Sequence, residues 1–226
     1  VVIGNFDGVH PGHREVLGVA RTLEPEARLI VVTFWPHPLS VVRPGDGPML
    51  LTRLEERVEL LEDAGADEVR VVRFTPEFAT WSPERFIDEV IEPLNPRRVV
   101  VGENFRFGHH AAGNVDTLRA LGAGRFEVTA LALVGLHDEE TCSTRIRDAL
   151  AVGDVHRAAE HLGRPFRFSG LVARGDRRGR QLGFPTANLP VPGHLACPAD
   201  GVYAGWVTRQ DGKDAHGVPL AVDAGP

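Results

Sequence analysis

The sequence predicts an α/β domain with a doubly wound parallel sheet, followed by a smaller all-β domain. Two observations lead to this fold class. Short β-branched runs alternate with longer helical patterns up to about residue 135, which is typical of a parallel sheet flanked by helices. After residue 164 no long helical period survives, and glycine and proline become frequent. We therefore predict domains over residues 1–163 and 164–226.

The first domain contains short β-branched or aromatic runs that we predict to be strands. They cover residues 1–3, 29–34, 68–74, 97–102 and 126–133. In doubly wound sheets, ligands lie beyond the carboxyl ends of the strands. We therefore expect the chemistry in the loops that follow Ile3, Phe34 and Gly102.

Between these strands, apolar residues recur with the 3.6-residue period of amphipathic helices. The predicted helices cover residues 13–23, 52–64, 83–91 and 115–121. Thr52 and Glu55 have the spacing of a capping box, and Ser82 precedes a proline at the first helical position, a common helix start. Two shorter helices are predicted at 144–152 and 155–162.

The second domain shows strand patterns at residues 166–172 and 202–207. Residues 211–226 show no element that could close its sheet. The first three residues, Val1 to Ile3, already show a strand pattern, and the sole methionine is Met49. We therefore expect a piece of a longer chain, truncated at both ends.

Composition excludes several functional classes. With 25 Lys and Arg against 31 Asp and Glu, the net charge is −6, which argues against a nucleic-acid or anionic-membrane binder. Lys213 is the only lysine, so a P-loop lysine is excluded and phosphate must be bound by Arg, His or backbone N–H groups. Two cysteines cannot build a disulfide framework, and without a signal peptide we expect a cytoplasmic protein.

The loop after the first predicted strand combines glycines with two histidines. Gly4, Gly8 and Gly12 let a backbone approach a ligand closely. His10 and His13 are three residues apart at a predicted helix start, so both imidazoles can converge on one anion near the positive end of the helix dipole. This pattern favours a phosphate site; a tight turn with incidental histidines is the alternative.

A zinc site is a second alternative for the histidines. It would be built from His10, His13, His109 and His110, because histidine pairs are common zinc ligands. The glycine density around His10 favours phosphate instead.

Two further stretches can be interpreted in more than one way. Ser143 or Thr144 is a suitable N-cap for a helix that carries Arg147, which either binds phosphate or is simply solvated. Phe105 and Phe107 flank Arg106 and should share one face of an extended segment, either in the core or in a ligand pocket. His37, between two prolines, receives no catalytic role.

The second domain carries a basic, glycine-rich segment with Arg174, Arg177, Arg178 and Arg180. It is either a surface hairpin with solvated arginines or a flap over phosphates. Thr186 and Asn188 place oxygen atoms on one face of an extended segment, which suits Mg²⁺ bound with a nucleotide.

Five stretches in order carry a resemblance to a known family. They are GNFDGVHPGH at 4–13, FWPHP at 34–38, GENFRFG at 102–108, STRIR at 143–147 and GFPTAN at 183–188. The chain resembles the bacterial bifunctional riboflavin kinase/FMN adenylyltransferases, the FAD synthetase family, with Cys142 where a serine is usual. The resemblance implies an HxGH-type nucleotidyltransferase domain followed by a partial riboflavin-kinase-like β-barrel.

The resemblance also implies residue roles for AMP transfer from ATP to FMN. Catalysis falls to His10, His13 and Arg147. Nucleotide and phosphate binding is expected of Gly4, Asn5, Phe6, Asp7, Gly8, Gly12, Ser143 and Thr144. Flavin binding is expected of Asn104, Phe105 and Phe107. In the kinase-like domain, nucleotide and metal contacts are expected of Gly175, Gly179, Arg180, Thr186 and Asn188, with Mg²⁺ held by Thr186 and Asn188.

Two other functions remain open at this point. One is a nucleotidyltransferase for another phosphorylated acceptor, such as a pantetheine or nicotinate nucleotide; the other is a non-catalytic flavin-binding module. The expected partners are ATP, FMN and riboflavin, and the oligomeric state is open. No glutamate follows Asn188, whereas the family has a catalytic glutamate downstream, so we expect this stretch to form FAD but to leave riboflavin unphosphorylated.

Overall fold

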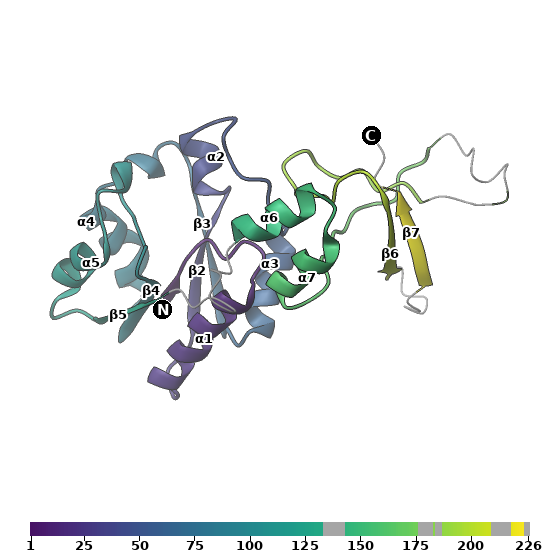
Figure 1. The fold of residues 1–226 in the computed structure, drawn as a ribbon. Coiled ribbons are helices and arrows are strands. Elements are labelled where there is room, and N and C mark those ends of the chain that lie inside the picture. Colours follow the sequence, from purple (N-terminus) through teal and green to yellow (C-terminus); the bar gives the residue numbers. More distant parts are fainter. Residues whose placement is uncertain (133–142, 176–182, 184–186, 209–217, 224–226) are drawn as a thin grey trace.

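The computed structural model describes residues 1–132, 143–175, 183, 187–208 and 218–223. Its main body is a five-stranded parallel sheet with helices on both sides (Figure 1). Within the described residues, no helix is long and apolar enough to cross a membrane.

The strand order of the sheet is β3-β2-β1-β4-β5, and all neighbours are parallel. The strands are β1 (Val2–Ile3), β2 (Ile30–Trp35), β3 (Glu68–Arg73), β4 (Arg98–Gly102) and β5 (Glu127–Leu131). All five predicted strands are confirmed, with ends that differ by up to two residues. The chain runs outward from β1 to β3 and then returns to β4, so β1 and β4 form the switch point where ligands of such sheets bind.

The two faces of the sheet belong to two hydrophobic clusters. Val2 packs in one cluster with α1 (Pro11–Leu23) and α3 (Leu54–Asp63). Ile3, the next residue, packs in the other with α4 (Pro83–Phe86) and α5 (Val115–Gly122). Successive side chains of a strand point to opposite faces, so helices cover both sides of β1. The predicted doubly wound arrangement is confirmed.

The helix predicted at 83–91 differs in form. Ser82 caps α4 by accepting a hydrogen bond from the Arg85 N–H at 3.3 Å, as predicted. The chain then continues as a π-helical turn, η2 (Ile87–Ile91), and a 3₁₀ turn, η3 (Glu92–Leu94). Pro93 has no N–H to donate, so it cannot extend regular α-helical bonding.

The capping box predicted at Thr52 and Glu55 is wrong. Arg53 is the N-cap of α3 and makes no side-chain capping bond. The Thr52 hydroxyl instead accepts from the Gly8 N–H at 3.2 Å and donates to Asp7 at 3.1 Å. Thr52 thus bonds Gly8 and Asp7, far away in the sequence, instead of capping α3.

Short helical segments were not predicted because they do not fill an apolar period. They are α2 (Pro38–Val42) and the 3₁₀ turns η1 (Phe78–Thr80) and η4 (His109–Ala111). The helix predicted from residue 13 begins earlier, at Pro11, with His10 as its N-cap. His10 therefore lies at the N-cap of α1, and His13 lies in its first turn.

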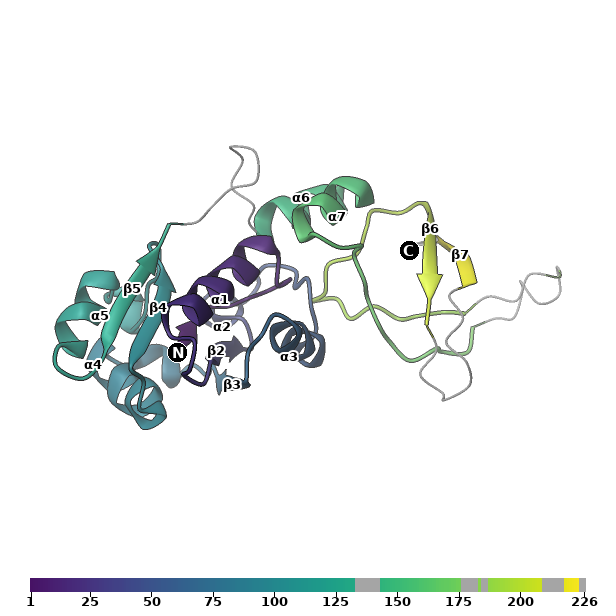
Figure 2. The same ribbon diagram turned by 90° about the horizontal axis from the view of Figure 1, so that it is seen from below.

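Helices α6 (Ser143–Ala151) and α7 (Val155–Leu162) lie between the five-stranded sheet and the C-terminal strands in both views (Figures 1 and 2). They share a third hydrophobic cluster with Leu51 and Ala196. Leu50 pairs with the same C-terminal segment: its N–H donates to the His194 carbonyl, and its carbonyl accepts from Ala196, each at 2.8 Å. The C-terminal part is thus attached to the segment between α2 and α3.

The C-terminal strands are β6 (Val202–Val207) and β7 (Val218–Asp223), which form an antiparallel pair. The predicted strand at 202–207 is confirmed. The one predicted at 166–172 is wrong: these residues carry no strand assignment, and among the residues described nearby Ala173 makes an isolated bridge to Asn188. Residues 211–226, expected to hold no element that could close the sheet, contain β7, which pairs with β6 alone among the described residues. Pro219 lies within this strand, and proline is tolerated at sheet edges.

Candidate active site

The loop after β1 holds two residues in strained backbone conformations. Phe6 and Val9 have φ values of 51° and 41°, which side-chain-bearing residues rarely adopt. Both side chains are buried in the cluster under α1, and the Val9 N–H donates to the Phe6 carbonyl at 3.1 Å. Packing therefore holds the loop in one shape, and such strain gathers at functional sites.

Gly8 lets this loop pass close to the segment around Leu51. Its φ is +86°, and a Cβ there would lie 2.9 Å from a methyl carbon of Leu51. A side chain at this position would therefore be both strained and crowded. Gly8 is thus required by packing, whatever it does toward a nucleotide.

His10 and His13 converge, as their spacing predicts. Their rings stack with centroids 3.7 Å apart and planes inclined by 21°. Phe6 sets the edge of its ring against His13, at 5.1 Å between centroids. The pair is thus fixed by the strained loop and by the first turn of α1.

Both imidazoles are neutral at pH 7. Burial lowers the pKa of His10 to about 4, although Asp7 opposes this shift. Burial, followed by the charges of His10 and Arg57, holds the pKa of His13 well below its usual value. The Nδ1 atoms of both rings are buried with no hydrogen-bond partner among the described residues. A neutral imidazole keeps one N–H, so each ring can serve as a neutral hydrogen-bond donor.

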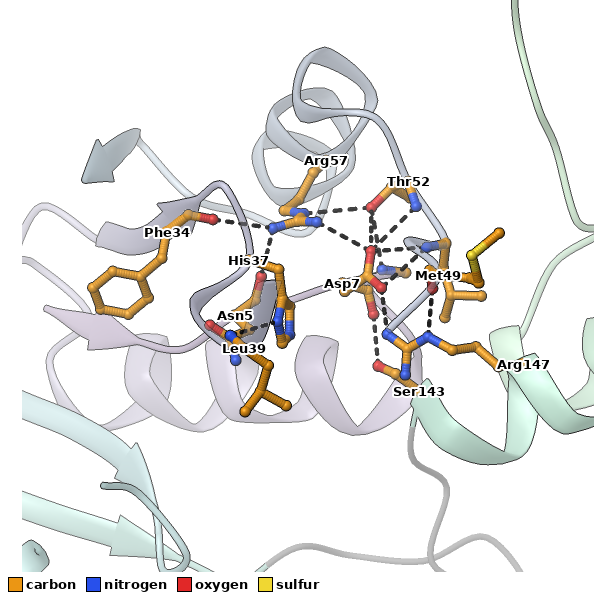
Figure 3. A network of polar contacts seen from close by, with 12 residues as sticks. Asn5, Asp7, Phe34, His37, Leu39, Met49, Thr52, Arg57, Ser143 and Arg147 are labelled. Carbon is orange, nitrogen blue, oxygen red and sulfur yellow. Dashed lines mark hydrogen bonds and ion pairs between the residues drawn. The ribbon is translucent and has the colours of Figure 1, made fainter. Parts of the chain in front are cut away.

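Asp7 is the centre of the polar network in Figure 3. Its buried carboxylate accepts from the Leu51 N–H at 3.0 Å and from the Thr52 N–H at 3.2 Å. Arg57 and Arg147 donate to it from their Nη2 atoms, at 3.1 and 2.6 Å. Protein donors thus take up the carboxylate, and the expected nucleotide contact of Asp7 stays a prediction.

Arg57 completes this network and was missed in the sequence. It is 0% exposed, and its Nη1 atom donates to the Asn5 carbonyl at 3.0 Å. A signal was available: Arg57 lies three and four residues before Leu60 and Leu61 on the buried stripe of α3. A charge on the apolar face of a helix needs buried partners.

The start of α6 is fastened to the same loop. The Ser143 hydroxyl donates to the Asp7 carbonyl at 2.8 Å, and Arg147 Nε donates to the Met49 carbonyl at 2.6 Å. Ser143 and Thr144 both lie inside the helix, so the predicted capping role is wrong for each: the Ser143 hydroxyl bonds across to the loop, and Thr144 is exposed. The structure thus brings Ser143 and Arg147 to the histidine loop.

The residues expected to bind flavin follow β4. Phe105 and Phe107 share one face, as predicted, with ring centroids 5.4 Å apart and planes inclined by 16°. Phe107 is buried and packs on Phe86 at 5.3 Å, whereas Phe105 is half-buried and Asn104 is exposed. Phe107 is therefore a core residue, and the other two can still reach a ligand.

His37 is a buried helix cap at the end of the loop that follows β2. Its Nδ1 atom accepts from the Leu39 N–H at 3.2 Å, at the start of α2. Burial lowers its pKa to about 4, so the ring is neutral at pH 7. Capping α2 is thus the role that the structure shows for His37.

The zinc alternative is wrong. His109 and His110 are exposed and stack on each other at 3.9 Å, whereas His10 is buried. Across the part of the chain that the structure describes, no three His, Cys, Asp or Glu side chains gather in a way that could hold a metal.

Of the residues expected to serve the kinase-like domain, Gly175 and Asn188 are described. A Cβ on Gly175 would lie 2.3 Å from the Asn188 side-chain nitrogen, so the two segments approach closely. Gly179, Arg180 and Thr186 lie outside the described residues, as do Arg177, Arg178 and Cys142.

A doubly wound sheet with a neutral histidine pair at its switch point defines an α/β protein of the nucleotide-binding kind. Residues 1–145 match the family described as FAD synthetase, and residues 162–222 match the one described as riboflavin kinase. The chain belongs to the FAD synthetase family. The resemblance seen in the sequence is thereby confirmed.

Relatives named bifunctional riboflavin kinase/FMN adenylyltransferase support this assignment. The protein of Bacillus subtilis strain 168 is 38% identical over 207 residues, which is 90% of this chain and 66% of the relative. That of Escherichia coli K12 is 37% identical over 225 residues, 96% of this chain and 71% of the relative. The chain thus spans about two thirds of the length of the relatives it matches.

A solved structure shows the same fold. It is described as a macrolide-efflux protein from Streptococcus pneumoniae, and it aligns with a TM-score of 0.86 and 30% identity. The alignment covers 99% of this chain and 73% of that one. Its printed name states another activity, so it supports the fold of this chain and not its reaction.

Proposed function

We propose that residues 1–163 transfer AMP from ATP to FMN, giving FAD and pyrophosphate. A phosphate oxygen of FMN attacks the α-phosphorus of ATP, and a new P–O bond forms. The bond between the α-phosphorus and the oxygen that bridges to the β-phosphorus breaks, and pyrophosphate leaves with that electron pair. Such a step depends mainly on positioning and on stabilisation of charge.

The stacked, neutral pair of His10 and His13 carries this proposal. The stacked rings lie at the start of α1, where the helix dipole also favours negative charge. Hydrogen bonds from imidazole to phosphate oxygens grow stronger as charge accumulates in the transition state. We assign both residues to that stabilisation.

Arg147 and the loop glycines complete the proposed site. Arg147 uses Nε and Nη2 for Met49 and Asp7, which aims the guanidinium and leaves Nη1 for a phosphate oxygen. Gly4 and Gly12 let the nucleotide come close to the protein backbone. Asn104 and Phe105 line the part of the site that would hold the flavin. When bound, Mg²⁺ would neutralise phosphate charge. Because Asp7 is already saturated, its carboxylate is not among the proposed metal ligands.

We propose that the C-terminal part is a riboflavin kinase module and that Gly175 and Asn188 lie in its nucleotide-binding site. Thr186 and Asn188 are the proposed Mg²⁺ ligands. The chain spans about two thirds of its relatives, so phosphorylation of riboflavin is proposed for the whole protein. A cytoplasmic location and small-molecule partners belong to the same proposal.

The test is formation of FAD from FMN and ATP, with pyrophosphate measured in equal amount. A pantetheine phosphate and nicotinate mononucleotide serve as competing acceptors. Transfer to FMN alone supports the proposal, whereas transfer to another acceptor replaces it. A chain that binds FMN without a single turnover would be a flavin-binding module.

A further inference from the structure

Arg57 connects the loop after β1 to the carboxyl end of β2 (Figure 3). Its Nη1 atom donates to the carbonyls of Asn5 and Phe34, at 3.0 and 3.4 Å. Its Nη2 atom donates to Asp7 Oδ1 at 3.1 Å. Asn5 and Asp7 lie in the loop after β1, and Phe34 lies near the end of β2. One guanidinium on α3 therefore binds the carboxyl ends of two neighbouring strands.

The geometry requires a planar group with several donors. Arg57 also lies over the Trp35 ring, 5.5 Å from its centroid, and its Nε atom points to the Thr52 hydroxyl at 3.4 Å. A guanidinium offers five donors in a fixed plane, whereas an ammonium group is a compact point charge. Lysine at this position could not bond both carbonyls and the carboxylate at once.

We propose that Arg57 is a positioning residue for adenylyl transfer, which holds the loop of His10 and His13 against the carboxyl end of β2. This inference rests on the proposed function. Arg57 is fully enclosed by protein, so it acts through Asn5 and Asp7 rather than on the reacting phosphates. Asp7 also accepts a hydrogen bond from Arg147 at 2.6 Å, so the position of Asp7 sets that of the Arg147 guanidinium.

A simpler role would be to neutralise the buried charge of Asp7. Removing one partner of a buried ion pair leaves an uncompensated charge and can unfold a protein. Arg57→Met alone therefore cannot separate the two roles. Asp7→Asn removes that charge while it keeps a similar shape, and Arg57→Met in the Asp7→Asn background then reports on positioning.

The experiment compares FAD formation by the wild type, the two single variants and the double variant. We expect Arg57→Met to lower kcat by about tenfold or more even in the Asp7→Asn background, with a smaller change in the KM for ATP. Arg57→Lys should not restore the rate. Arg119→Met, which removes an exposed arginine on α5, is the matched control. A change below about twofold in the Asp7→Asn background would overturn the proposal.

Amide hydrogen exchange gives a second readout that needs no turnover. Relative to Asp7→Asn, the double variant should exchange faster at residues 4–10 and 34–39, and not at β4 and β5. Unchanged exchange in those two loops overturns the role of Arg57, whether or not FAD forms. A wild type that forms no FAD overturns the proposed function instead, and exchange alone then decides on Arg57.

Discussion

Arg147 donates from Nη2 to Asp7 Oδ2 at 2.6 Å, across 140 positions of sequence. The arginine lies on α6, and the carboxylate lies in the loop that leads to α1. This ion pair is largely enclosed, with side-chain exposures of 18% and 2%. It therefore sets where the Arg147 guanidinium points relative to the two stacked imidazoles.

Arg147→Ala should weaken nucleotide binding as well as the rate of FAD formation. It removes a guanidinium from the proposed phosphate site and one charged partner from Asp7, so we also expect a loss of roughly 2–4 kcal/mol in unfolding free energy. Titration with ATP and urea unfolding measure the two effects. Arg145→Ala, an exposed neighbour on the same helix, is the control; unchanged ATP affinity in Arg147→Ala would make Arg147 a structural residue only.

Replacing either histidine of the pair by alanine should act on the rate. We expect His10→Ala and His13→Ala each to lower kcat for FAD formation by about 100-fold or more, and to leave FMN binding largely intact, because the imidazoles act on charge that appears in the transition state. Steady-state kinetics and FMN titration check this. His109→Ala, at an exposed site, should be neutral, and a loss confined to KM would contradict the assignment.

Stability should fall as the pH is lowered from about 6.5 to about 4. The pKa of His10 is about 4 in the folded protein and 6.5 in the reference state, so the unfolded chain binds the extra proton within that window. Once the pH is below both pKa values, His10 alone lowers the free energy of unfolding by roughly 3 kcal/mol. Urea unfolding across this range measures it.

His10→Gln should remove the part of that pH dependence that His10 contributes, while the lowered pKa values of His13 and His37 keep the rest. His109→Gln should leave the pH dependence unchanged. The rate of FAD formation follows the same titration, because the imidazoles must stay neutral to act as proposed. Its acid limb should therefore lie near pH 4, the pKa of His10. An inflection at pH 6.5 that disappears in His10→Gln would show that the histidine is not buried as described.

Gly175→Ala should impair the kinase-like module of the whole protein. The added Cβ would lie 2.3 Å from the Asn188 side-chain nitrogen, so the amide must move. We expect riboflavin phosphorylation to fall by about tenfold or more while FAD formation from FMN stays unchanged. Gly193→Ala is the matched control, since a Cβ there meets no heavy atom within 4 Å. Equal kinase rates in both variants would remove Asn188 from the proposed site.

The parallel sheet could be predicted because its signals are local. Val31 and Val32 already show a short β-branched run, and burial on both faces follows from the helices that flank it. The convergence of His10 and His13 was also local, since three residues span less than one helical turn. What the sequence could not supply was the partner of Asp7, because Arg57 and Arg147 lie 50 and 140 positions away.

The same limit explains the errors in the candidate site. Thr52 and Ser143 both have the residue type of helix caps, yet the structure gives their hydroxyls to Asp7. A long-range acceptor overrode the local preference in each case. Arg57 could have been singled out only by asking why a charge stands on the buried stripe of a helix.

The pairing of Leu50 with residues 194–196 has a mechanical consequence. A second module joined to a first by one stretch of chain is free to tilt about that stretch. Here the C-terminal part is attached by more than the chain near residue 163: Leu50 exchanges hydrogen bonds with His194 and Ala196, the Ala199 N–H donates to the Leu150 carbonyl, and Arg167 pairs with Glu56. Leu51, the residue after Leu50, donates its N–H to Asp7. Any tilt of the C-terminal part would therefore pull on the backbone segment that binds Asp7 in the proposed transfer site.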